Sequence, residues 1–154
     1  MDEVMNDSLA KDRDIADLMK LLKKFHDKDS MEKLNRTVEY VDSLEQTLSA
    51  ILEQLTDMRE ELKGVREQND YLMTRAERTV KDGLTKQVAK AEEKVQELHG
   101  KLVEIKDSIK QKAHELVEEA KHLGRKALKR LSEVLYICEG LEKIREQADQ
   151  MLGS

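Results

Sequence analysis

The chain has 154 residues, of which 40% are charged and 3% aromatic, and it contains no proline and no tryptophan. A compact globule of this size draws much of its buried area from aromatic side chains, so the composition argues against one. It is typical of long helices and coiled coils instead. The formal charge of −5 comes from interleaved acids and bases, which excludes a polybasic nucleic-acid binder overall.

The compartment is inferred from what the sequence lacks. A single cysteine, Cys138, excludes an intramolecular disulfide. The start, Met1-Asp2-Glu3, does not have the basic-then-apolar order of a signal peptide. The longest uninterrupted apolar stretch, residues 134–138, is far shorter than the ~20 residues needed to span a bilayer. We therefore expect a cytoplasmic protein.

The first predicted helix follows a polar, aperiodic start at residues 1–13. Its apolar residues recur at spacings of three and four and form one stripe: Ile15, Leu18, Met19, Leu22 and Phe25. Asp29 followed by Glu32 has the pattern of a capping box that opens the next helix. We divide the chain into a short N-terminal helix with a frayed start, residues 1–28, and a long helical hairpin or coiled coil with a terminal helix, residues 29–154.

The clearest signal is a heptad pattern that starts at Leu34 and continues for seven heptads, with eleven of its fourteen a and d positions apolar. The a positions are Leu34, Val41, Leu48, Leu55, Leu62, Asn69 and Ala76, and the d positions are Thr37, Leu44, Ile51, Met58, Val65, Leu72 and Thr79. Apolar residues at e positions widen the stripe beyond a two-stranded seam. This width suits a bundle or an antiparallel hairpin better than an isolated dimer.

A second heptad frame begins near Leu84. Its apolar positions are Leu84, Val88, Ala91, Val95, Leu98, Leu102, Ile105, Ile109 and Leu116. Twelve residues separate Ala76 from Val88, so on a straight helix the two stripes would lie ~120° apart. Gly83 sits at the mismatch and can take the positive φ of a helix C-terminus. The pattern predicts a tight turn at residues 81–84; a kinked continuous helix is the alternative.

After Ile109 the apolar spacing relaxes, and Gly124 predicts a break before a last helix at about residues 126–152. Together the elements predict an all-α fold. Its long amphipathic helices would form an antiparallel coiled-coil hairpin or an elongated helical bundle.

Two polar features of these helices allow a role besides packing. Asn69 falls at an otherwise apolar a position, where an Asn either fixes the register of a parallel dimer or simply lies in solvent. His114, Glu118 and His122 share one helical face, but the sequence has no second Glu-x-x-His motif of the kind that metal-binding bundles use. We interpret this face as solvated and expect no metal and no cofactor.

The only dense basic run lies at residues 121–131, where leucines and an alanine interleave with five cations: Lys121, Arg125, Lys126, Lys129 and Arg130. A basic amphipathic helix can contact an anionic membrane or phosphates. The competing interpretation is that the run pairs with segment 30–79, whose eleven acidic and seven basic residues give −4. In a hairpin that turns near Gly83, the run would come beside residues near 35–45.

The sequence shows no glycine-rich phosphate loop, no cysteine pair and no Ser/His/Asp order, so we expect no enzyme. The leading hypothesis is a non-catalytic structural or protein-interaction module that acts through coiled-coil or helical-bundle association, with a protein partner or with itself. The alternative is peripheral membrane or nucleic-acid binding through segment 121–131. The residues expected to carry helix packing are Leu44, Leu48, Ile51, Leu55, Leu62, Asn69, Leu98, Leu102, Ile105 and Ile109.

Segment 15–25, the pair Tyr40-Val41 before the leucine-rich coil, and segment 114–131 together resemble an uncharacterised helical family of gut Firmicutes that is associated with integrated mobile elements. The resemblance spans most of the chain and implies a bacterial helical protein. That family has no assigned activity, so the resemblance implies no functional residues.

Overall fold

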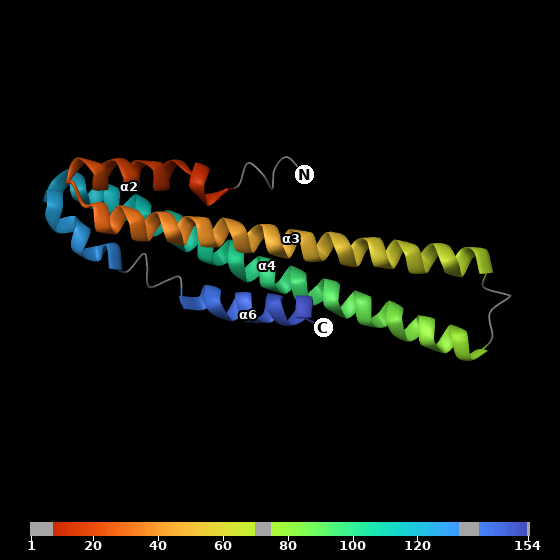
Figure 1. Cartoon of the computed structure of the whole chain (residues 1–154). Helices are drawn as coiled ribbons and strands as arrows, with labels where there is room; N and C mark the ends of the chain where they lie inside the picture. Colours follow the sequence, from red (N-terminus) through yellow and green to blue (C-terminus); the bar gives the residue numbers. More distant parts are fainter. Residues whose placement is uncertain (1–7, 70–74, 133–138, 154) are drawn as a thin grey trace.

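The computed structural model describes residues 8–69, 75–132 and 139–153 of the protein. In these three ranges every regular element is a helix, which confirms the predicted all-α class. The two longest helices, α3 (Lys28–Asn69) and α4 (Arg75–Leu123), run antiparallel along each other (Figure 1). Their 42 and 49 residues correspond to about 63 and 74 Å at ~1.5 Å per residue. We call the end where α3 finishes and α4 begins the tip of the hairpin, and the opposite end its base.

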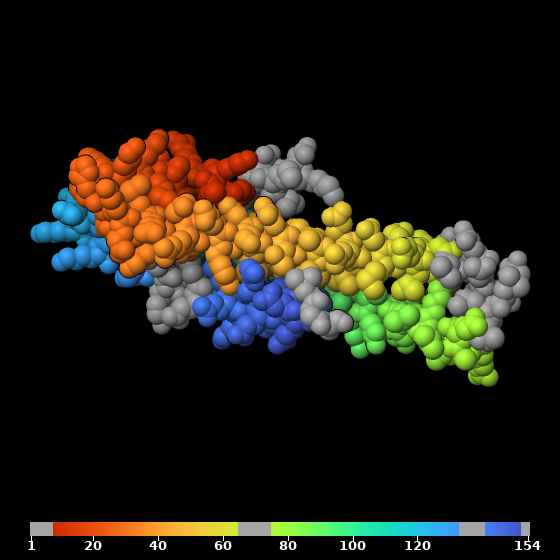
Figure 2. Space-filling view, viewed as in Figure 1, coloured from red at the N-terminus to blue at the C-terminus, as the bar shows by residue number. Residues whose placement is uncertain are grey.

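Shorter elements cover only the part of the hairpin nearer the base. The 3-10 helix η1 (Leu9–Lys11) and the helix α2 (Arg13–Lys24) lie on one side. The 3-10 segment η3 (Gly124–Arg130) and the helix α6 (Glu139–Gly153) lie on the other side (Figure 1). Both α2 and α6 contact α3 and α4. The molecule is thick at the base and narrows toward the tip, where two helices continue alone (Figure 2).

The N-terminal helix α2 has defined signals at both ends. The carboxylate of Asp12 accepts hydrogen bonds from the backbone N–H groups of Asp14 at 3.0 Å and Ile15 at 3.2 Å, so Asp12 is its N-cap. After α2 the backbone of His26 has a φ of 57°. This left-handed conformation, which histidine adopts more readily than most residues, prevents the helix from continuing into α3.

The long helix α3 is capped by Asp27, and the predicted capping box at Asp29 is wrong by two residues. Asp27 accepts hydrogen bonds from the backbone N–H of Ser30 at 3.2 Å and from its hydroxyl at 2.8 Å. These hydrogen bonds hold the pKa of Asp27 below its ordinary value, the hydroxyl bond first, with a smaller contribution from the positive charge of Arg125. Asp29 already lies in the first turn and pairs with Lys33 at 3.1 Å.

The predicted turn at residues 81–84 is wrong. Helix α4 runs without interruption through Gly83, where an added Cβ would meet nothing within 4 Å. The two long helices are divided between Asn69 and Arg75, and residues 70–74 lie outside the described ranges. Ala76 and Val88 therefore lie on the same helix, which begins at Arg75. The first heptad frame belongs to α3 and does not extend to Ala76, so the mismatch of the two frames does not mark a turn at Gly83. No glycine lies between Asn69 and Arg75. The position of Gly83 therefore did not indicate where the hairpin turns.

The predicted break at Gly124 is confirmed. Its φ is +60°, a conformation that glycine adopts at little cost and that other residues adopt with strain. Gly124 is followed by the 3-10 segment η3, so the predicted last helix does not start at about residue 126. Helix α6 is described from Glu139 to Gly153.

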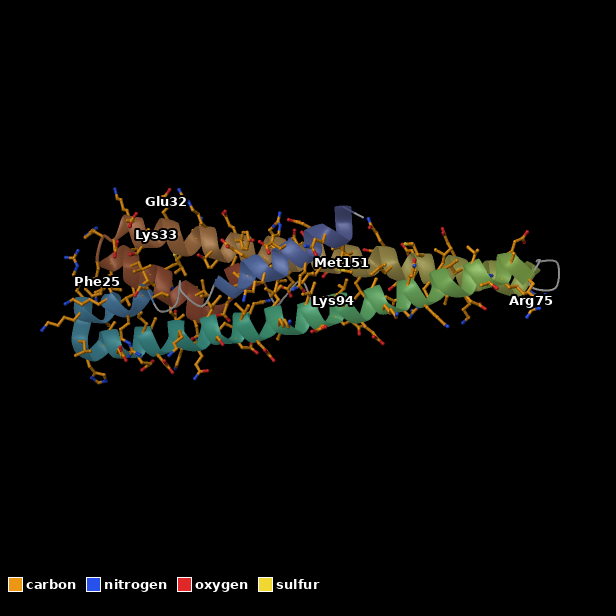
Figure 3. All side chains as sticks on the ribbon, turned by 90° about the horizontal axis from the view of Figure 1, so that it is seen from below. Phe25, Glu32, Lys33, Arg75, Lys94 and Met151 are labelled. Atoms are coloured by element: carbon orange, nitrogen blue, oxygen red, sulfur yellow. The ribbon has the colours of Figure 1, made fainter. Side chains whose placement is uncertain are left out.

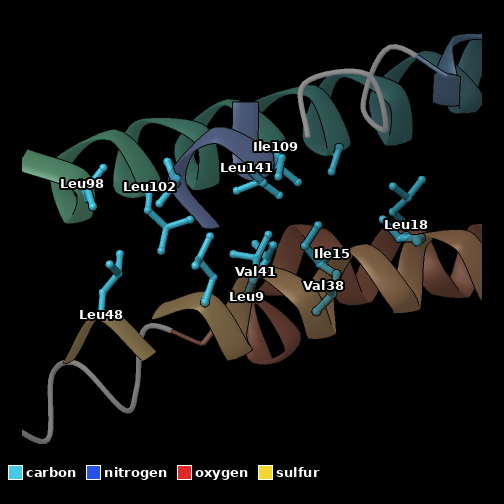
Figure 4. Packing of buried hydrophobic residues seen from close by; sticks show 14 of the residues in the cluster. Leu9, Ile15, Leu18, Val38, Val41, Leu48, Leu98, Leu102, Ile109 and Leu141 are labelled. Carbon is cyan, nitrogen blue, oxygen red and sulfur yellow. The ribbon is translucent and has the colours of Figure 1, made fainter. Parts of the chain in front are cut away.

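One continuous hydrophobic core joins all the helices near the base (Figure 4). Its fully buried members include Leu9 of η1, Leu18 of α2, Val41 of α3, Leu102 of α4 and Leu141 of α6. Since every helix contributes, none of them packs independently. The core ends partway along the hairpin, at Ile51 of α3 and Val95 of α4.

Candidate interaction surfaces

The side chains predicted to carry helix packing fall into two groups along the hairpin. Those nearer the base are buried in the core, namely Leu44, Leu48, Ile51, Leu98, Leu102 and Ile109. Leu55 and Ile105 are half-buried and pack against the core. Leu62 is half-buried nearer the tip, and Asn69 is the last residue of α3, with its side chain outside what the structure describes. Only the first group is sealed from water.

A buried ion pair crosses the core between the long helices, and sequence reasoning missed it. The Nζ atom of Lys106 lies 2.7 Å from Oε2 of Glu45, and the two side chains are 1% and 8% exposed. The Nε2 atom of His99 lies 3.7 Å from the other oxygen of Glu45. The abundance of charge hides such a pair in the sequence, and the misplaced turn gave the wrong register.

Two ion pairs fix the register of the hairpin. Glu45 faces Lys106, and Arg59 lies 3.1 Å from Glu92. In both pairs, residue n of α3 faces residue 151 − n of α4. This rule places each residue of α3 level with a residue of α4, from Lys28 with Leu123 to Asn69 with Asp82.

Toward the tip the hairpin carries an open apolar groove on the side where α6 lies. The groove has a volume of about 940 Å³ and begins at Met151, near the end of α6. Figure 3 shows that the hairpin continues well beyond Met151, to Arg75 at the tip. Its apolar walls are formed by Ile51, Leu55, Met58 and Leu62 of α3 and by Val80, Leu84 and Val88 of α4. We call these residues, with Met151, the tip groove.

The exposure of the tip groove is unusual for a monomer. Val80 is 64% exposed, Met58 48% and Leu84 45%. Single exposed apolar side chains are common on proteins, but a contiguous patch marks an interaction surface. These three residues line one groove, so they form a patch.

A buried cation lines the same groove. Lys81 is 7% exposed, and its Nζ atom has no hydrogen-bond acceptor in the described part of the chain. Burying an ammonium group without a partner is costly. Glu61 also lines the groove, but the register places Lys81 nine residues, or ~13 Å, farther toward the tip.

The basic run at residues 121–131 spans the end of α4 and the segment η3. Lys121 pairs with Glu118 at 2.9 Å, and Arg130 pairs with Glu119. Both carboxylates belong to α4, so the predicted pairing with residues near 35–45 of α3 is wrong. Because the hairpin turns earlier in the chain than expected, the register places Lys121, the first cation of the run, level with Ser30 at the start of α3.

The apolar side of this basic run mostly faces the protein. Ala127 and Leu131 are buried, and Leu128 packs half-buried against the core. Leu123 is the exception, because it is exposed at the base of the molecule. The exposed cations around it include Lys121, Arg125, Lys126 and Lys129.

The histidine face of α4 makes ordinary polar contacts. The Nδ1 atom of His114 lies 3.0 Å from Oδ1 of Asp14 on α2. A hydrogen bond from Lys121 lowers the pKa of the Glu118 carboxyl below its ordinary value. Among the described residues, no three or more His, Cys, Asp or Glu side chains are grouped so that they could hold a metal ion.

Fold and surface together define the class of protein: an elongated α-helical bundle whose central hairpin leaves an apolar groove open to water. No helix in the described ranges combines the length and the apolar character needed to cross a bilayer. Residues 11–154, nearly the whole chain, match a family of unknown function (DUF6674), and the chain belongs to this family. Comparisons with curated proteins and with solved structures find no match.

Proposed function

We propose that the protein is a non-catalytic structural or protein-interaction module, and that the tip groove is its docking surface. The observation that carries the proposal is the exposure of Met58, Val80 and Leu84 in one apolar groove. Helix α6 packs along α3 and α4 nearer the base, and Met151 is the one residue of α6 in the described ranges that lines the groove. An occupant would remove Met58, Val80 and Leu84 from water, which is favourable by ~25 cal/mol per Å² of apolar area.

The neighbouring stretch of the hairpin indicates what kind of occupant fits. There the same two helices accept α6, which contributes Leu141, Ile144 and Ala148 to the core. These residues follow the i, i+3, i+7 spacing with which an amphipathic helix fills an apolar groove. We therefore propose that the occupant of the tip groove is also a helix, with an apolar face of this spacing.

Site-specific photo-crosslinking tests this function in cells of the native host. A photoreactive amino acid at Leu84 would lie in the groove, whereas one at Ala89 would lie on the exposed side of the same helix. We expect covalent adducts with protein at position 84 and none at position 89, with the crosslinked peptide identified by mass spectrometry. Equal adducts at both positions, or adducts with lipid or nucleic acid alone, would refute the proposal.

A second candidate function is binding to an anionic membrane or to nucleic acid through segment 121–131. The observation that favours it is Leu123, 56% exposed among cations at the base. Liposome flotation and DNA mobility shifts at two salt concentrations test it, because a phosphate-dependent interaction weakens as salt rises. Absence of binding at low salt would eliminate this candidate.

The proposal also covers the source of the protein and its cellular compartment. The resemblance to a helical family of gut Firmicutes supports a bacterial protein of integrated mobile elements that acts in the cytoplasm. Recombination or transfer genes beside its own gene, and recovery of the protein in the cytoplasmic fraction, are the expected results. A housekeeping neighbourhood or a secreted protein would contradict it.

A further inference from the structure

We infer that the base of the molecule binds the surface of an anionic phospholipid membrane, with Leu123 inserted between the headgroups and the hairpin standing upright on the bilayer. This inference rests on the second candidate function, because it names the anion and the orientation for the same end of the molecule. It is independent of the tip groove, which lies toward the opposite end. The charge of the base, the exposure of Leu123 and the elongated shape support it.

The base brings together two segments that lie far apart in the sequence. Helix α2 ends there and α3 begins there, beside the end of α4 and the start of η3 (Figure 1). Phe25, which follows α2, lines the same shallow hollow as Lys121 of α4, and Figure 3 places Phe25 at the end of the molecule. Arg125 of η3 lies close enough to Asp27 for its charge to help lower the pKa of that carboxyl. We call residues 23–28 and 121–129 the basic end.

The basic end concentrates positive charge in a chain whose net charge is negative. It contains seven basic residues and one acidic residue, which give +6, whereas the rest of the chain contains twenty-one basic and thirty-two acidic residues, which give −11. All seven cations are exposed. They are Lys23, Lys24, Lys28, Lys121, Arg125, Lys126 and Lys129. The molecule therefore presents a positive end face on an acidic body.

Most of these cations have no internal counter-charge. Lys121 pairs with Glu118, and the other six form no ion pair within the described part of the chain. The one acid, Asp27, accepts hydrogen bonds from Ser30. The other acids of the adjoining turns are each paired with a cation outside the basic end: Asp29 with Lys33, Glu32 with Arg36 and Glu119 with Arg130. The six cations are therefore available to an external anion.

Leu123 favours a membrane over a nucleic acid as that anion. It is the last residue of α4 and is 56% exposed. Gly124, with its φ of +60°, turns the chain so that η3 packs back against α4, and this leaves Leu123 at the corner. A nucleic acid would contact the cations through its phosphates and gain nothing from the leucine. At a membrane, the leucine enters the boundary between headgroups and acyl chains while the cations contact the headgroups.

The acidic body sets the orientation on the bilayer. If the hairpin lay flat, its acidic sides would come within the Debye length of ~8 Å from the anionic headgroups, and the net charge of −11 would be repelled. Contact through the basic end keeps most of these acids farther away, since α4 alone is about 74 Å long at ~1.5 Å per residue. The tip groove would then be held away from the bilayer, where a helix in solution can reach it.

Vesicle flotation with the purified full chain tests the binding. We expect the chain to float with phosphatidylcholine vesicles that contain about 30% phosphatidylserine, and not with phosphatidylcholine alone. Binding should be strong at ~50 mM salt and at least tenfold weaker at ~500 mM, because salt screens the attraction. Arg125→Ala with Lys126→Ala should lower the partition coefficient about 25-fold, at about fivefold for each cation. Lys86→Ala with Lys90→Ala removes two exposed cations of α4 nearer the tip and, as the matched control, should change it less than about twofold.

Leu123→Ser separates lipid from nucleic acid as the ligand. It should lower the partition coefficient about tenfold with unchanged helicity, because Leu123 is already largely exposed. Absence of vesicle binding at ~50 mM salt, or a Leu123→Ser variant that binds as well as wild type, would overturn the inference. Retardation of duplex DNA without vesicle binding would overturn it while leaving the second candidate function in place, and absence of both would eliminate that function too. Docking at the tip groove is measured separately, by the crosslink at position 84.

Neutron reflectometry on a supported bilayer of the same anionic composition tests the orientation. An upright molecule should form a protein layer about 70 Å thick, the length of the long helices, whereas a flat one should form a layer of about 25 Å, the width of two or three packed helices. A bound layer of about 25 Å would overturn the upright arrangement.

Discussion

Removing the carboxylate of Glu45 should be among the most damaging single changes near the base. The pair with Lys106 has a separation of 2.7 Å, which corresponds to roughly 6 kcal/mol of gross attraction at an effective dielectric constant of ~20. Most of this attraction is offset by the cost of desolvating both groups. Glu45→Ala removes the attraction but leaves the desolvation of a side chain that is 1% exposed. We expect the free energy of unfolding to fall by about 3–5 kcal/mol.

Urea unfolding followed by far-UV circular dichroism measures this loss, at a protein concentration low enough to exclude association. Domains of this kind have about 5–15 kcal/mol in total, so the midpoint should shift far while the denaturant slope stays constant. Glu53→Ala removes the same charge from an exposed position on the same helix and should change stability by less than ~0.5 kcal/mol. Glu45→Leu combined with Lys106→Met should be near neutral or stabilising. Equal effects of Glu45→Ala and Glu53→Ala would refute the reasoning.

Four further substitutions test the helix ends, the interior of α4 and the core, each by urea unfolding. Gly124→Ala should destabilise by about 1–2 kcal/mol because its φ is +60°, whereas Gly83→Ala, inside α4, should stabilise by up to ~1 kcal/mol; the reverse order would contradict the assigned turn. Asp27→Ala should cost about 1 kcal/mol. The folded pKa of Asp27 lies below the ordinary 3.8. The contribution of the Asp27 cap to the free energy of unfolding is therefore complete above pH 3.8 and disappears as the pH falls through the folded pKa. A stability difference between Asp27→Ala and wild type that does not shrink at low pH would contradict the cap. Leu48→Ala, at a fully buried position, should lower the free energy of unfolding by about 2–5 kcal/mol. A loss below ~1 kcal/mol would show that Leu48 is not packed in the core between α3 and α4.

The all-α class and the identity of the apolar residues by which α3 packs against the core could be predicted, because both depend on local periodicity. Leu34, Val41 and Leu48 recur every seven residues, and all three are buried. The position of the turn could not be predicted in the same way. Gly83 offered a helix-ending residue type, but glycine inside a long helix costs only ~1 kcal/mol, and packing along the rest of α4 outweighs this cost.

The candidate site was hidden from the sequence for a different reason. Leu48 and Leu62 occupy equivalent heptad positions, yet Leu48 is buried and Leu62 lines the open groove. The difference corresponds to the part of the hairpin against which α6 packs. A heptad repeat specifies which face of a helix is apolar. It contains no information on which part of that face another segment of the chain covers. The pair of Glu45 and Lys106 depends on the same long-range register.

The confinement of the core to one end of the hairpin has a dynamic consequence. Opening of the two helices at the tip breaks few buried contacts, because the core stops at Ile51 and Val95, whereas opening at the base requires global unfolding. Amide hydrogens should therefore exchange fastest near the tip and progressively more slowly toward the base. A molecule that docks at the tip would tighten its least stable part, so that the affinity of docking and the protection of those amides rise together.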